Sequence, residues 1–269
     1  MKNEAWALRV EKIWWWVSRY TQENNKNTKE NVSERWFAAQ IYSAIRDADF
    51  NATDTLIELA HFLSDWKKNQ AVEQLLYIQQ QTERILSEHY SEYSTDSWLH
   101  QVISQQFEDL KYYISLYDKD EELSDSNDYW GSYSIMWFWE NLTAKIYEYL
   151  LRKEWLDVVY LSTEWMKTWD EKIKDMWELL VLMKQRIKEI LGNEDIEWKV
   201  IISPGFIGNL LWGINGMIGR WFTDTVTWLV ALSLLDTNLF KKVVFEVQKD
   251  VDWVLSTNPS DLNDVERVK

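Results

Sequence analysis

The stretch 203–235, SPGFIGNLLWGINGMIGRWFTDTVTWLVALSLL, constrains the fold more than any other part of this chain. It holds five of the chain's seven glycines and one of its two prolines. Its only charged residues are Arg220 and Asp224, although charged residues make up 27% of the chain. An apolar surface of this size must be covered by other helices, by a partner chain or by lipid. We therefore expect this segment to organise the half of the protein that contains it.

The remainder of the chain contains few residues that interrupt helices. Outside 203–235 it has one proline and two glycines, and this scarcity, together with several long amphipathic runs, predicts an all-α fold. The run Glu197–Ile202 is the one stretch that could form a strand. Helices are expected at about 4–20, 32–48, 53–68, 70–93, 98–117, 135–151, 156–191, 222–235 and 239–255.

Very short turns separate several of these expected helices, which predicts antiparallel neighbours. A helix–corner–helix layout recurs, for example in IELAHFLSDWKKNQAVEQLLYI, KIYEYLLRKEWLDVVYLS and VTWLVALSLLDTNLFKKVVFEV. This layout resembles the helical hairpin of tetratricopeptide-type (TPR) repeats, although no period of about 34 residues holds. The expected architecture is a stack of antiparallel helical hairpins in an irregular TPR-like arrangement.

An acidic run, DKDEELSDSND at 118–128, divides the chain in two. Such a run is typical of a solvated loop or a boundary. We expect an N-terminal helical subdomain at 1–117, an acidic linker at 118–132 and a C-terminal helical subdomain at 133–269.

Charge and composition exclude several classes of partner and of chemistry. The formal net charge of −15 argues against nucleic acid as the main partner and against anionic lipid, because both attract clustered Lys and Arg. The absence of cysteine removes disulfides, thiol nucleophiles and Cys-bound metals. The first twenty residues carry charges throughout their apolar region, so no signal peptide is expected and the cytoplasm is the predicted location.

Aromatic residues are unusually frequent, with 19 tryptophans in 269 residues. Trp14, Trp15 and Trp16 are consecutive, and on a helix three such positions span about 200° of the circumference. A single core-facing stripe cannot hold all three. Trp137, Phe138 and Trp139 raise the same problem. Buried interface centres favour aromatic anchors, so these two clusters predict a non-enzymatic interaction or assembly subunit that binds a protein partner or a second copy of itself.

The apolar segment allows three further interpretations. Its glycines Gly213, Gly216 and Gly219 recur every three residues and, flanked by Trp212 and Trp221, would allow a second helix to approach closely. Irregular packing in the core is the preferred interpretation. Its two apolar halves are shorter than a membrane span, so the alternative function is a protein that releases the segment onto lipid. The run VIISPGFIG could also be a strand, a turn and a helix start whose backbone N–H groups hold an anion.

The chain has only three histidines, so few residues are available for histidine-based catalysis or metal binding. Arg84 and His89 have the Arg-x4-His spacing, and this resembles all-helical HEPN-type ribonucleases. The resemblance implies that the Arg and His of two protomers meet and that the His helps to activate a ribose hydroxyl, which makes RNA cleavage a second alternative. Glu58 and His61 form the chain's one Glu-x-x-His motif, whereas di-iron bundles use two. We expect no metal, no cofactor and no catalytic residue beyond the ribonuclease pair.

Overall fold

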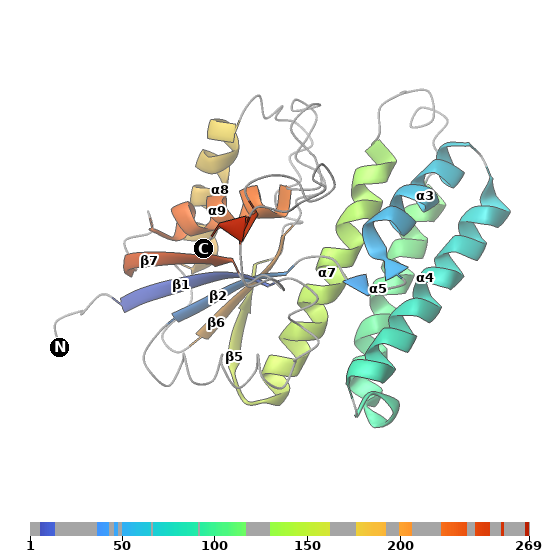
Figure 1. Ribbon diagram of the computed structural model, residues 1–269, viewed down its shortest axis with the longest axis horizontal. Coiled ribbons are helices and arrows are strands. Elements are labelled where there is room, and N and C mark those ends of the chain that lie inside the picture. The colour runs from blue at the N-terminus through green and yellow to red at the C-terminus, as the bar shows by residue number, and fades with distance from the viewer. Residues whose placement is uncertain are drawn as a thin grey trace.

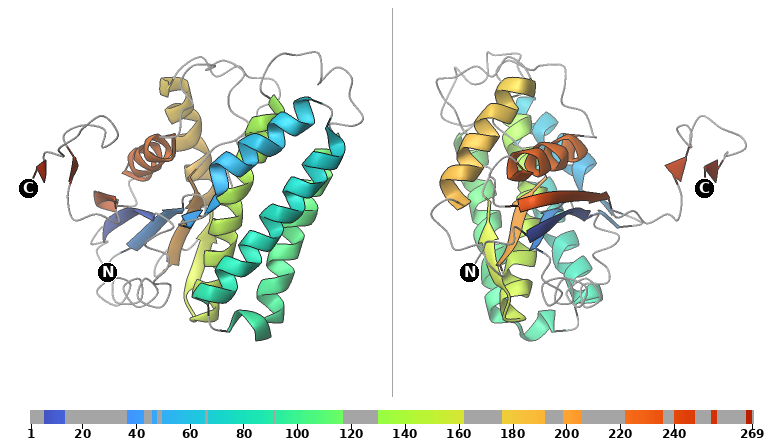
Figure 2. Two further views of the ribbon diagram at one scale, coloured as in Figure 1. Left: turned by 45° about the vertical axis from the view of Figure 1, so that its right-hand side comes forward. Right: turned by 90° about the vertical axis from the view of Figure 1, so that its left-hand side faces the viewer.

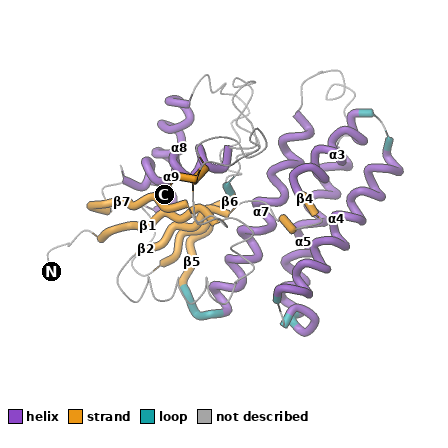
Figure 3. Tube along the Cα trace, viewed as in Figure 1, coloured by secondary structure: helices purple, strands orange, loops and turns teal. Residues whose placement is uncertain are grey.

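Helices dominate the described part of the chain, and a parallel sheet lies beside them (Figures 1 and 3). The computed structural model describes residues 6–13, 37–42, 46–47, 50–65, 67–90, 92–116, 130–161, 176–191, 199–205, 222–235, 240–247, 254–255 and 267–268. The predicted helical majority is confirmed. The sheet corrects the expectation of an all-α fold.

The sheet contains β1 (Trp6–Ile13), β2 (Phe37–Tyr42), β5 (Asp157–Tyr160), β6 (Lys199–Pro204) and β7 (Phe240–Val247). Their order is β5-β6-β2-β1-β7, and every neighbouring pair is parallel. Two small antiparallel ladders join β3 (Arg46–Asp47) to β4 (Phe50–Asn51) and β8 (Val254–Leu255) to β9 (Arg267–Val268). Parallel neighbours require crossover connections, so helices must cover the sheet.

Four of these strands lie where helices were expected. β1, β2 and β7 fall within the expected helices 4–20, 32–48 and 239–255, and β5 falls at the start of the expected helix 156–191. Short apolar runs in a buried parallel sheet cannot be told from buried helix by periodicity alone. In β1, Trp6, Leu8 and Val10 do alternate with less apolar residues, which is the strand period. The one run that could form a strand by its sequence, 197–202, overlaps β6.

The helices of the described residues match the expected ranges more closely. They are α3 (Ala52–Ser64), α4 (Lys68–His89), a 3₁₀ turn η1 (Tyr93–Thr95), α5 (Ser97–Leu116), α7 (Trp130–Lys153), α8 (Met176–Leu191) and α9 (Phe222–Leu235). α3 and α4 pack as the expected hairpin. The other two hairpin units are a helix followed by a strand, α7–β5 and α9–β7, so the TPR-like stack does not extend through the chain.

Both faces of the sheet are covered. In β6, Val200 and Ile202 belong to the same buried cluster as α7, whereas Ile201 between them is buried outside that cluster. Alternate strand residues point to opposite faces, so each face has its own cover. α9 packs on β1 and β7, and α8 packs on α9. Figures 1 and 2 show α8 and α9 on one side of the sheet and α7 with the other helices on the other side.

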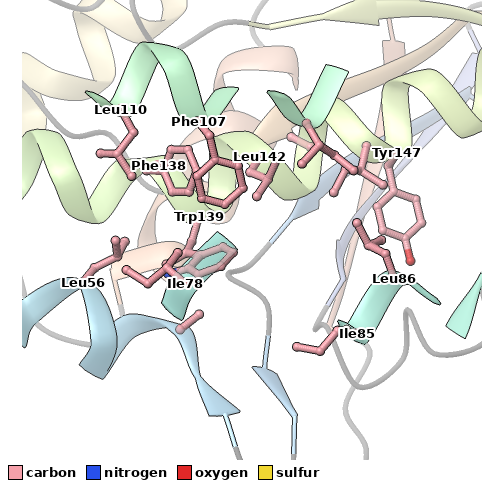
Figure 4. Packing of buried hydrophobic residues seen from close by; sticks show 14 of the residues in the cluster. Leu56, Ile78, Ile85, Leu86, Phe107, Leu110, Phe138, Trp139, Leu142 and Tyr147 are labelled. Atoms are coloured by element: carbon pink, nitrogen blue, oxygen red, sulfur yellow. The ribbon is translucent and has the colours of Figure 1, made fainter. Parts of the chain in front are cut away.

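α7 is the helix that joins the two parts of the protein. It packs on β2, β5 and β6 and also on α3 and α5. Its aromatic residues fill the core between these elements (Figure 4): the rings of Phe107 and Phe138 lie 5.1 Å apart, and Trp139 has no exposed surface. Of the expected linker 118–132, residues 118–129 lie outside the described residues, and residues 130–132 belong to the start of α7.

A membrane-spanning helix is not found among the described elements. None of these helices has both the length and the apolarity that crossing a bilayer requires.

Candidate functional site

The sheet has one edge at which a ligand site is expected on topological grounds. After β2 the chain passes through α3, α4 and α5 to α7, which covers one face of the sheet. After β6 it passes to α9, which lies with α8 on the other face. In open α/β sheets, ligands bind outside the carboxyl ends of adjacent strands whose connections diverge in this way. We call the end residues Ile41, Tyr42, Ser203, Pro204 and Gly205 the switch-point edge.

The register of the two strands aligns this edge. Tyr42 lies opposite Pro204, and Ile41 lies opposite Ser203. Ser203 is buried and its hydroxyl donates a hydrogen bond to the Pro204 carbonyl at 3.1 Å. Gly205 is also buried, and it leads directly into the glycine-rich stretch at 206–221, which lies outside the described residues. The strand part of the alternative interpretation of VIISPGFIG is therefore present as β6, and the helix start that it also required lies outside the described residues.

The middle of α7 lies near the carboxyl end of β5, the strand beside β6. The tight corner at Glu154–Leu156 joins the end of α7 to the start of β5, so the helix runs antiparallel to the strands and its earlier residues lie nearer their carboxyl ends. Asn141 of α7 is bonded to Tyr160, the last residue of β5. Glu140, which precedes it, is only 7% exposed. A buried carboxylate at such a position is suited to receive a cationic ligand group.

The start of α3 also lies beside this part of α7. Phe50 of β4 is buried, and its ring meets Trp139 edge-on with centroids 5.5 Å apart. Asn51 caps α3: its side-chain oxygen accepts from the backbone N–H of Asp54 at 3.4 Å. The β3–β4 ladder and the cap thus bring the first turn of α3 against the α7 segment that contains Glu140.

A chain of polar side chains connects β5, α7 and α5. Tyr160 donates its hydroxyl to Asn141 Oδ1 at 2.5 Å, and Asn141 Nδ2 donates to Gln106 Oε1 at 2.5 Å. Lys145 Nζ lies 3.5 Å from the centre of the Tyr160 ring and pairs with Glu148 at 2.9 Å. Asn141 and Gln106 are both buried.

A second polar cluster lies near the opposite end of α7. Asp96 caps α5 by accepting from the Leu99 N–H at 3.0 Å, and it also accepts from Tyr149 at 2.6 Å and Lys153 at 2.9 Å. Burial alone would raise the pKa of Asp96, but these hydrogen bonds and one from Tyr90 outweigh burial and lower it to about 2. Its role is to join the start of α5 to the end of α7.

The same cluster shifts the pKa values of its other members. Hydrogen bonds to Glu92, Tyr90 and Asp96 hold the pKa of Lys153 well above its usual range. Burial, together with the bond to Asp96, raises the pKa of Tyr149 to about 12. The cluster is therefore a stable arrangement of opposite charges at neutral pH.

The aromatic anchors expected from the sequence lie in different environments. Trp14, Trp15 and Trp16 follow β1 directly in the chain but lie outside the described residues, as do Trp212, Gly213, Gly216, Gly219 and Trp221. Trp137 is on α7. Phe138 and Trp139 are buried in the core, where Phe107, Phe50 and neighbouring side chains surround them, so they present no surface to a partner.

The expected ribonuclease pair lies on α4. Arg84 Nη1 donates to both carboxylate oxygens of Glu88 at 3.0 Å, and its Nε donates to Gln81. His89 is the last residue of that helix. Within the described residues, no three or more His, Asp or Glu side chains form a group that could hold a metal ion.

Sequence reasoning missed two features that could serve function. Glu140 could have been noticed as the single acid in the run MWFWENL, on an otherwise apolar helix face. Large exposed aromatics on α8 and α9 were also missed: Trp177 is 68% exposed and Trp228 is 51% exposed. Val181 shares a helix face with Trp177, because the two are four residues apart.

The sequence matches no protein-family model, and a comparison with curated proteins gives no match. Solved structures do show a likeness of fold. Aspartokinase III of E. coli with aspartate and ADP, in its R-state, superposes with a TM-score of 0.58 at 16% identity, covering 98% of this chain and 53% of that chain. The same enzyme with lysine and aspartate, in its T-state, gives 0.59 at 16% identity, with 98% and 54% covered. Aspartate kinase of Clostridium acetobutylicum gives 0.52 at 14% identity, with 97% and 51% covered.

This chain therefore spans about half the length of the solved structures it resembles. The likeness supports an α/β fold that extends over nearly the whole chain.

Proposed function

We propose that this chain binds a small amino acid or a nucleotide at the switch-point edge. The observation that best supports this is the likeness over 98% of the chain to a protein captured with aspartate and ADP, and again with lysine and aspartate. The topology supports the same place independently, because the connections of β2 and β6 diverge there.

Two charged residues would each bind a different group of the ligand. The buried carboxylate of Glu140 would receive the ammonium group of an amino acid. Lys12 is the only cation among the last two residues of the five described strands of the sheet, and it lies opposite Ile41 in the register of β1 and β2. A cation near this edge would suit a phosphate or a carboxylate.

The test is titration calorimetry of the full chain with aspartate, lysine and ADP. We expect at least one amino acid to bind. Glu140→Gln should weaken the affinity for that amino acid by roughly tenfold or more, because a hydrogen bond between charged groups is lost. Glu148→Gln is the matched control: it is the same change on the same helix, but Glu148 pairs with Lys145 and Arg152 away from the edge. Lys12→Met should instead weaken the affinity for ADP.

If none of the three ligands binds at millimolar concentration, the proposal is wrong. Since the structural neighbours are kinases, a chain that binds both aspartate and nucleotide would next be assayed for phosphoryl transfer from ATP to aspartate.

We also propose that the protein associates through exposed aromatic surface, with a protein partner or a second copy. The supporting observation is the exposure of large apolar side chains on two neighbouring helices: Trp177 and Val181 on α8 and Trp228 on α9 are half exposed or more. Light scattering should give a concentration-dependent mass above 32.5 kDa, and Trp228→Glu should lower it. Trp98→Glu on α5, a Trp of comparable exposure, should leave the mass unchanged.

The two alternatives from sequence have direct assays. Flotation with liposomes that depends on Leu211 and Leu229 would favour release of segment 203–235 onto lipid. RNA cleavage that is lost in His89→Ala would favour the ribonuclease.

A further inference from the structure

The parallel sheet has a long strand at one of its edges. β7 is eight residues long and pairs with β1 on one side, and no other strand of the described residues pairs with it. Figure 1 shows β7 at the end of the sheet away from β5. A strand at an edge presents a row of backbone N–H and C=O groups with which a further strand can pair.

Symmetry limits how a second copy of β7 could pair with this edge. The register of β7 against β1 is regular from Lys242 to Val247. Two copies of one edge strand lie antiparallel and side by side when a twofold axis runs perpendicular to the sheet. Directly opposite residues share a face of the sheet, and faces alternate along a strand. The residue numbers in each opposite pair are therefore both even or both odd.

One of the allowed registers pairs opposite charges. The regular part of β7 contains one basic and one acidic residue, Lys242 and Glu246, and both numbers are even. An axis at Val244 places Lys242 of each copy opposite Glu246 of the other. The same axis places Val243 opposite Phe245. Pairs of opposite charge and pairs of an aromatic with a β-branched residue both stabilise antiparallel strands.

Glu246 has a residue of like charge opposite it within its own sheet. In the register of β1 and β7 it lies opposite Glu11. Like charges at directly opposite positions destabilise a sheet. Lys242 of a second copy would give Glu246 an opposite charge on its outer side. The charge pattern of β7 therefore favours a second copy of the same strand as its partner.

The helix that covers this edge of the sheet also carries exposed apolar residues. α9 packs on β1 and β7, and its residues Trp228 and Leu235 are 51% and 40% exposed. A twofold axis perpendicular to the sheet keeps the same face of the sheet on the same side in both copies. The pairing therefore brings both copies of α9 to one side of the joined sheet.

We propose that the protein forms a homodimer in which two copies of β7 pair antiparallel about a twofold axis at Val244. The two sheets join into one, with β5 at both ends. This inference names the second copy as the partner in the association proposed above, and it rests on that proposal.

Charge exchange in the full-length protein tests the register, with the mass measured by light scattering over a range of concentrations. Lys242→Glu should weaken dimerisation by roughly tenfold or more, because it turns the symmetry-related pairs with Glu246 from attraction to repulsion. Glu246→Lys should weaken it in the same way. The double variant restores opposite charges in reverse order, so its dimerisation constant should return to within about threefold of the wild-type value.

A cysteine at the axis gives a second measurement. The chain has no cysteine, so Val244→Cys introduces a single thiol. Directly opposite Cβ atoms of antiparallel strands lie about 4.5–5.5 Å apart, so mild oxidation should link the two copies by a disulfide bond. Val243→Cys is the matched control: it changes the neighbouring valine, which lies opposite Phe245 instead of itself, and it should not cross-link.

The results separate this interface from the broader proposal. If the wild type keeps a mass of 32.5 kDa at every concentration, association with a second copy fails and this interface fails with it. If the wild type dimerises but the charge variants have no effect and Val244→Cys cross-links no more than Val243→Cys, pairing through β7 is refuted, while association through the exposed aromatics stands. A dimer that Lys242→Glu dissociates and the double variant does not restore contradicts the register.

Discussion

Trp155 occupies a backbone position that suits glycine, and replacing it should stabilise the protein. Its φ is 65°, and no other non-glycine residue in the described part of the chain has a positive φ. It lies just after the end of α7, where Trp155 N–H donates to the Arg152 carbonyl at 3.0 Å and Leu156 N–H donates to the Leu151 carbonyl at 3.1 Å. This is the Schellman arrangement, whose left-handed position is usually glycine.

The magnitude follows from three contributions. A side chain with a Cβ loses about 1–2 kcal/mol in the left-handed region. Glycine gives the unfolded chain more conformational freedom, and this lowers the free energy of unfolding by about 0.5–1 kcal/mol. The indole is 95% exposed, so its removal forfeits almost no burial. We expect Trp155→Gly to stabilise the fold by roughly 0.5–1 kcal/mol, or about 1–4 °C in melting temperature for a chain of this size.

The assay is thermal and urea denaturation of Trp155→Gly beside Trp155→Ala. Alanine keeps the Cβ that causes the strain, so it should give little or no gain. If alanine stabilises as much as glycine, or if glycine destabilises, the strain argument is wrong and the indole itself contributes to stability.

Three other changes test the packing and the caps. The folded pKa of Asp96 is about 2, and it is lowered from an unfolded value of about 3.9, so its contribution, on the order of 2 kcal/mol, is present above about pH 4 and lost as the pH falls toward 2. Urea denaturation between pH 2 and 6 should show this acid limb in the wild type, and Asp96→Asn should remove it. Trp139→Ala should cost about 3–5 kcal/mol because it leaves a cavity in the core, so a measured loss below about 1 kcal/mol would contradict its burial. Asn51→Ala should cost about 1 kcal/mol by uncapping α3, seen as faster hydrogen exchange in its first turn, with Asn69→Ala on α4 as an exposed control.

Helix positions were predictable where the periodic pattern is long. α3, α4 and α5 lie within a few residues of their expected ranges, because an amphipathic stripe repeated over several turns has no comparable strand alternative. α9 matches its expected bounds at both ends.

Most of the parallel strands were not predictable in this way. Val158 and Val159 of β5 are two apolar residues in a row, which fits a buried strand as well as a turn of buried helix. The strand state is decided by pairing with Lys199–Ile202, some forty positions along the chain. Such pairing leaves no local signature, so the expected helical hairpins extended across these strands.

The candidate site also has one part that was recognisable from the sequence and one part that was not. The run VIIS was recognisable from its apolar residues as the one stretch that could form a strand, and it leads to this edge. Glu140 was not, because a single acid in a helix has meaning only once the sheet edge lies beside it.

The sequence by itself determined that helices form most of the described structure, and it located the unusual apolar segment and the one run that could form a strand, since these depend on local composition and period. The tertiary structure alone decided that the chain forms a parallel sheet, that Trp139 lies inside the core while Trp155 is exposed, and that the ends of β2 and β6 lie side by side. These outcomes depend on contacts between residues that are distant in sequence, and neither composition nor periodicity specifies which distant partners meet.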